Sequence, residues 1–176
     1  MSSLRPYDEN NMKAAIEEAA LASKEGKMPF GAVLADADGT VVVRAHNQCT
    51  QAKKRGGSGT VDVTRHAEME LIRTFCTRVP PETRPFCTLY TSTEPCVMCA
   101  GAIYWSGVGR VVYGCSAEQL ETLSGPGGFD VDVRKLCGMA SEGARTIEVE
   151  GPLLAHESLL VHDASGVWKN PYSKRD

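Results

Sequence analysis

The chain reads Tyr90-Thr91-Ser92-Thr93-Glu94-Pro95-Cys96-Val97-Met98-Cys99-Ala100-Gly101-Ala102 where an expected strand passes into an expected helix. The strand is predicted over 88–91 and the helix over 96–106. Pro95 suits the first turn of a helix, because its missing N–H costs nothing there. This junction predicts a strand, a turn and a helix that carries two cysteines at its start.

Strands and helices alternate along the rest of the chain, which predicts an α/β fold with helices covering a central sheet. No internal repeat or linker indicates a second domain. We therefore expect a single domain over 1–176, with a catalytic core over about 8–150 and a C-terminal helix and tail over 151–176. The other expected elements are a helix over 8–25, strands over 30–35 and 41–45, a helix that begins at 64–66 with Thr64 as its cap and runs past 73, a strand over 110–113, a short helix over 131–139, a strand over 146–149 and a helix over 153–161.

The composition is that of a soluble globular protein, with 42% hydrophobic and 23% charged residues. A net charge of -3 gives no overall attraction for nucleic acid and favours a small-molecule partner. No apolar run has the length of a membrane span or a secretory signal, so no membrane contact is expected. Seven cysteines without such a signal predict a reduced, cytoplasmic setting, where cysteine pairs more often bind metal than form disulfides.

Cys96, Cys99 and His66 have the chemistry of a zinc site. A spacing of three at a helix start places both sulfurs on one face of one turn, and the positive helix end favours thiolates. One imidazole and two thiolates fill three corners of a zinc tetrahedron and leave the fourth open for water, as in catalytic sites. Glu68 lies two residues beyond His66, in position to carry a proton beside that water.

This combination predicts hydrolysis at a carbon that bears an amino group. Zinc lowers the pKa of bound water toward neutrality, and a nearby carboxylate such as Glu68 can pass its proton to the ring and then to the departing amine. A Cys-x-x-Cys pair alone is also a redox motif or half of a structural zinc site. The Cys96-x-x-Cys99 pair and the His66-x-Glu68 motif together favour the catalytic zinc site over these alternatives.

The two motifs, with Met28-Pro29-Phe30-Gly31-Ala32-Val33 and His46-Asn47, resemble the cytidine-deaminase-like superfamily of zinc deaminases. The resemblance is strongest to the branch that holds guanine deaminases, fungal cytosine deaminases and tRNA adenosine deaminases. It implies a three-layer α/β fold, with a mixed five-stranded sheet between helices, and a homodimer. It also implies that His66, Cys96 and Cys99 bind Zn²⁺ and that Glu68 is the proton shuttle.

The same resemblance suggests residues that contact the substrate. It implies that Asn47 bonds the substrate ring and that Phe30 and Ala67 line the pocket. Trp105 and Asp130 belong to runs that are similar to guanine deaminases, and Asp130 could accept a hydrogen bond from a guanine-type ring N–H.

Alternative roles stay open for several of these residues. Asn47 could be a strand-end turn residue, and Asp130 could be an exposed helix N-cap. Glu94 could supply a backbone oxygen, fix its loop, or be a solvated or structural carboxylate. The aromatic run over 168–172 could close the pocket or pack on the surface.

Hydrolytic deamination of guanine, a step of purine salvage, is the favoured function, with deamination of cytosine or of a free nucleoside as the alternative. Asp62-Val63-Thr64 stands where guanine deaminases usually carry Asp-Pro-Thr, and the loop over 48–63 is longer than expected. A tRNA adenosine deaminase is the second alternative, in which Arg65 and the Lys53-Lys54-Arg55 run would contact phosphates. The net negative charge argues against nucleic acid as a partner, and Glu68 argues against an inactive scaffold.

Overall fold

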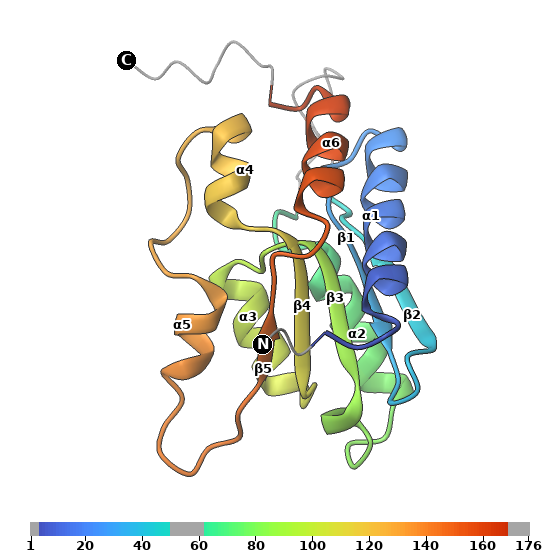
Figure 1. Ribbon diagram of the computed structural model, residues 1–176, viewed down its shortest axis with the longest axis vertical. Helices are drawn as coiled ribbons and strands as arrows, with labels where there is room; N and C mark the ends of the chain where they lie inside the picture. Colours follow the sequence, from blue (N-terminus) through green and yellow to red (C-terminus); the bar gives the residue numbers. More distant parts are fainter. Residues whose placement is uncertain (1–3, 50–61, 169–176) are drawn as a thin grey trace.

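The computed structural model describes residues 4–49 and 62–168, so the Lys53-Lys54-Arg55 run and the residues over 169–172 lie outside the described residues. Five strands are present in this part of the chain: β1 (Gly31–Ala35), β2 (Val41–His46), β3 (Thr88–Thr93), β4 (Arg110–Cys115) and β5 (Glu148–Glu150). They form one sheet in the order β2-β1-β3-β4-β5 (Figure 1). β1 runs antiparallel to β2 and β3, whereas β3, β4 and β5 are parallel. The predicted mixed five-stranded sheet is confirmed.

Helices cover both faces of this sheet. They are α1 (Asp8–Lys24), α2 (Ala67–Arg78), α3 (Val97–Ser106), α4 (Ala117–Ser124), α5 (Val133–Gly138) and α6 (Ala155–Ser165), with a 3-10 turn over Arg84–Phe86. α1 and α6 lie on one face, and α2 and α3 lie on the other, where α5 packs against α3 (Figure 1). Among the described helices, none has the length and apolar character needed to cross a bilayer.

The three central strands of the sheet are buried between these two helical layers. Every residue of β1, β3 and β4 is buried, as expected for strands covered on both faces. Gly31 allows α1 to lie directly on β1, because a Cβ at this position would come within 2.2 Å of the Ala19 backbone nitrogen. The two halves of the core are Met12, Ala15, Val33, Tyr90 and Val112 under α1, and Leu71, Phe75, Leu89, Ile103 and Val111 under α2 and α3.

Two features differ from the sequence-based expectations. α2 begins at Ala67 with His66 as its N-cap residue, so the prediction of Thr64 as its cap is wrong. The Thr64 hydroxyl instead donates a hydrogen bond to Asp62 Oδ1 over 2.5 Å. α4 was not expected at all. Its start carries a capping box, in which Ser116 and Gln119 each accept a hydrogen bond from the other's backbone N–H.

Candidate zinc centre and active-site pocket

The predicted metal ligands lie at the starts of two helices that pack against each other. His66 is the N-cap residue of α2, and Cys96 is the N-cap residue of α3. Neither side chain caps its own helix, so both are available to a ligand. Cys99 follows in the first turn of α3. The strand-turn-helix unit therefore brings both sulfurs beside an imidazole that comes from a separate part of the chain.

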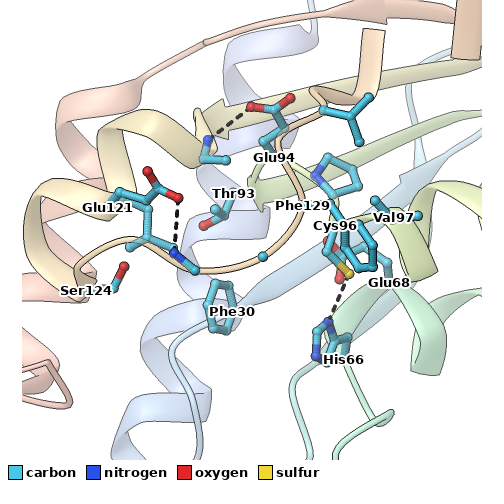
Figure 2. A pocket seen from close by; sticks show the side chains of 16 residues that line it. Phe30, His66, Glu68, Thr93, Glu94, Cys96, Val97, Glu121, Ser124 and Phe129 are labelled. Carbon is cyan, nitrogen blue, oxygen red and sulfur yellow. Dashed lines mark hydrogen bonds between the residues drawn. The ribbon is translucent and has the colours of Figure 1, made fainter. Parts of the chain in front are cut away.

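The distances between the donor atoms fit zinc. Nδ1 of His66 lies 3.7 Å from Sγ of Cys96 (Figure 2). It lies 3.5 Å from Sγ of Cys99. Zinc bonds of ~2.0 Å to nitrogen and ~2.3 Å to sulfur, arranged tetrahedrally, would separate N and S by about 3.6 Å. The three donor atoms all lie within 4.8 Å of one another. His66, Cys96 and Cys99 can therefore hold a zinc ion.

The surroundings shift the pKa values of the two thiols in opposite directions. Hydrogen bonds from Cys99 and His66 lower the pKa of Cys96 to about 4, which favours its thiolate. The neighbouring Cys96 sulfur and burial both raise the pKa of Cys99. Binding of zinc to such a pair ionises the second thiol and releases its proton.

Glu68 lies beside the three ligands and is only 6% exposed. Its Oε1 accepts a hydrogen bond from the Thr91 hydroxyl over 3.0 Å, and its Oε2 lies 3.5 Å from Sγ of Cys99. Burial is the main cause that raises the pKa of Glu68 above its usual value. A carboxyl group with a raised pKa next to a metal site is suited to proton transfer near neutral pH. Thr91, in the middle of β3, was not predicted to contribute.

A cavity of about 220 Å³ opens onto His66, Glu68 and Cys96 (Figure 2). Its described lining contains neither lysine nor arginine. The other lining residues are mainly apolar. They come from the residue before β1, the end of β3 and the turn into α3, the start of α3, α4 and the loop after α4: Phe30, Thr93, Glu94, Pro95, Val97, Ala117, Leu120, Glu121, Ser124, Gly127, Gly128, Phe129 and Val131. The capping box at Ser116 was the sequence signal that could have predicted the α4 part of this wall.

Of the predicted substrate contacts, Phe30 lines this cavity. Asn47 and Ala67 are buried and do not line it. Asn47 Oδ1 accepts a hydrogen bond from the Cys49 backbone over 2.6 Å, as a turn residue does. Asp130 lines a neighbouring cavity that shares the Phe129 wall.

Trp105 lies outside the cavity, on the surface of α3, with 84% of its area exposed. The helix-cap role considered for Asp130 is wrong, because Asp132 is the N-cap of α5 and accepts a hydrogen bond from the Lys135 backbone over 2.6 Å. Trp168 packs on Phe30, with ring centres 6.3 Å apart.

A covered α/β sheet with a His-Cys-Cys donor set and a buried glutamate defines a zinc-dependent deaminase. Residues 6–115 match the family model of the cytidine and deoxycytidylate deaminase zinc-binding region. The chain belongs to this family and is a hydrolase that acts on C–N bonds.

Individual relatives differ in substrate. The chain is 36% identical over 161 residues to a probable cytosine deaminase of Schizosaccharomyces pombe, which covers 89% of this chain and 90% of the relative. It is 38% identical over 102 residues to a guanine deaminase of Bacillus subtilis, covering 58% of this chain and 57% of that protein. A solved structure from studies of A-to-I editing by tRNA:A34 deaminases superposes with a TM-score of 0.62 at 30% identity, covering 86% of this chain and 98% of the other.

Proposed function

We propose that this protein deaminates a free nucleobase or a related aminated heterocycle by hydrolysis. The observation that carries the proposal is the cavity beside Glu68 and the three zinc ligands. Its volume of about 220 Å³ is below the ~300–1,000 Å³ of pockets for drug-sized ligands. The described walls are mainly apolar and carry neither lysine nor arginine, which suits a flat, uncharged ring better than a phosphate.

The roles of the side chains follow from their positions. Zinc, when bound, supplies a hydroxide equivalent at neutral pH. Glu68 accepts the proton of the attacking water and delivers it to a ring nitrogen and then to the leaving amine. Thr91 holds one carboxylate oxygen, while the other stays on the side of the zinc ligands. Phe30 and Phe129 offer apolar surfaces to the ring.

Guanine is the first candidate substrate, because Phe129 of the Gly128-Phe129-Asp130 run contributes to the cavity wall. Cytosine is the second candidate, and the similarity to the probable cytosine deaminase over most of both chains supports it. The proposed substrate is thus a small free base in the cytoplasm. Arg65, a residue considered for tRNA binding, pairs with Glu70 over 2.8 Å.

A panel of guanine, guanosine, cytosine, cytidine, adenine, adenosine and triazines, assayed for ammonia release, tests the proposal. We expect release from at least one free base and none from the nucleoside 5′-phosphates added as a control. Zinc-loaded protein that releases no ammonia from any of these compounds would overturn the proposal. Affinity for tRNA that falls steeply with salt, together with inosine formation, would instead support the editing function.

The proposal includes a homodimer. Trp105, Met139 and Met98 are exposed apolar side chains, and a groove of about 440 Å³ lies between Trp105 and Met139. Apolar surface of this kind marks protein–protein contacts. Light scattering on wild type and Trp105→Glu tests this part of the proposal, with a dimer and a monomer expected.

A further inference from the structure

One carboxylate connects the zinc-binding turn to two helices that follow it in the chain. Glu94 lies two residues before Cys96, and its backbone N–H donates to the Cys115 carbonyl over 2.8 Å. Its Oε2 accepts a hydrogen bond from the Ala117 backbone N–H over 3.0 Å. Its Oε1 accepts one from the Val133 backbone N–H over 2.8 Å (Figure 2 shows the side chain of Glu94). Both oxygens are thus committed to backbone donors.

Ala117 and Val133 are the first residues of α4 and α5. Backbone N–H groups at a helix start have no partner within the helix and need an acceptor from outside. Ser116 and Asp132 each satisfy one such group as N-caps. Glu94 satisfies a second group at both helices, so it fixes their starts relative to the end of β3.

The segment between these two fixed points forms one wall of the cavity. It contributes Leu120, Ser124 and Phe129, among others. Its glycine-rich part has little support of its own, because Gly125 and Gly128 have positive φ and open space around them. The hydrogen bonds from Gly127 to Glu121 and from Val131 to Phe129 stay within the segment.

We infer that Glu94 is a positioning residue that sets the width of the substrate cavity. The inference deepens the proposed deaminase function and rests on it. Glu94 lines the cavity, but both of its carboxylate oxygens are occupied by the starts of α4 and α5, so its proposed effect is through these helices. It holds the α4 wall at a fixed distance from Cys96 and Glu68, and that distance determines whether a one-ring or a two-ring base fits beside the zinc.

Two variants and a control separate this role from a general effect on folding. In Glu94→Ala both acceptors are lost. In Glu94→Gln the amide oxygen can serve one N–H, while its NH₂ group faces the other, so half of the bridge is lost. Glu118→Gln removes a carboxylate from the first turn of α4 that takes no part in the bridge, and it serves as the matched control.

The first readout is amide hydrogen exchange, which needs no activity. Exchange should speed up over 117–124 and 129–136 in both Glu94 variants and stay unchanged over 97–106, in α3. The second readout is the ratio of kcat/KM for a purine and a pyrimidine in direct competition. This ratio does not depend on the fraction of active enzyme, and we expect it to change about tenfold with zinc content unaltered.

Unchanged exchange over 117–124 and 129–136 would overturn the inference, whatever the activity. Faster exchange with an unchanged competition ratio would also overturn it, because Glu94 would then be structural only. If Glu94→Ala fails to fold, Glu94→Gln decides both readouts. Wild type that releases ammonia from none of the bases would refute the proposed function instead, a result that is separate from the exchange readout.

Discussion

The hydroxyl of Thr91 donates a hydrogen bond to Oε1 of Glu68 over 3.0 Å, and both side chains are buried. The bond joins the middle of β3 to the first turn of α2, 23 residues apart in the chain. A buried carboxylate held in this way has one oxygen fixed and one oriented toward the reaction. Thr91 is not among the residues that line the cavity, so in the proposed mechanism its role is to position Glu68.

Thr91→Val should reduce kcat by about tenfold, which corresponds to ~1.4 kcal/mol, with a much smaller effect on KM. Valine has nearly the same shape as threonine but cannot donate, so Glu68 keeps its place and loses its orientation. Steady-state kinetics with the best base of the panel measure the effect, and Thr91→Ser should restore most of the rate.

Thr88 provides a matched control in the same strand. It is fully buried, and its hydroxyl has no hydrogen-bond partner in the described part of the chain. Thr88→Val should leave kcat unchanged. Equal loss of rate in the two valine variants would show that β3 responds to any change of this kind and that the Thr91 bond has no special role.

Glu68→Gln should keep zinc and lose deamination. The amide has the size of the carboxyl group but cannot carry a proton, and the loss of general acid–base catalysis is typically ~10²–10⁴-fold. Metal analysis should still find about one zinc per chain, because the proposed ligands are His66, Cys96 and Cys99. Loss of zinc together with activity would mean that Glu68 supports the metal site itself.

Asp8 and Arg110 should contribute more to stability than other ion pairs of the protein. Both are almost fully buried, and two hydrogen bonds of 2.8 Å connect the guanidinium to the carboxylate. Tyr90 donates a third bond to Asp8 over 2.6 Å. Asp8→Ala should lower the free energy of unfolding by ~3–5 kcal/mol, because the buried Arg110 guanidinium loses both bonds to Asp8 and keeps its bond to the partly exposed Glu148.

Urea unfolding measures this loss, and a double variant provides the control. Asp8→Leu combined with Arg110→Met removes both charges and should cost less than Asp8→Ala alone. A double variant that is the least stable of the set would contradict this account of the pair.

The order of strands and helices could be predicted because strand and helix patterns are local. The zinc ligands could be predicted for the same reason, since each motif occupies a few consecutive residues. α4 was missed because its apolar residues are few, although the Ser116-x-x-Gln119 box is a local signal of a helix start.

The contacts that shape the pocket could not be predicted in this way. Glu94 bonds to residues 23 and 39 positions away, and the chain path that brings them together is a property of the whole fold. The same holds for Thr91 and Glu68. Trp105 shows the opposite case. Its run resembles guanine deaminases in sequence, but its side chain is exposed on α3 and does not line the cavity.

His162 of α6 is a buried histidine close to the pocket wall. Its exposed fraction is 1%, its Nε2 lies 2.8 Å from the Thr93 hydroxyl, and its ring packs on Phe30 with centres 5.0 Å apart. Burial lowers the pKa of His162 to about 4 from an ordinary 6.5. The folded protein therefore holds this imidazole neutral.

Stability should consequently fall as the pH drops from 6.5 toward 4. In this range the unfolded chain binds a proton at His162 and the folded chain does not, so protonation favours unfolding. The pKa of His162 differs by about 2.5 between the unfolded and the folded state. At ~1.4 kcal/mol per pH unit, this difference amounts to ~3 kcal/mol at the acid end.

His162→Gln can keep the bond to Thr93 but does not titrate, so its unfolding free energy should fall less steeply over this range. His156→Gln, on the exposed side of the same helix, should follow wild type. Comparing variants at each pH cancels the effect of zinc release, which all of them share. Parallel pH profiles for His162→Gln and wild type would show that burial of His162 is not a source of acid sensitivity.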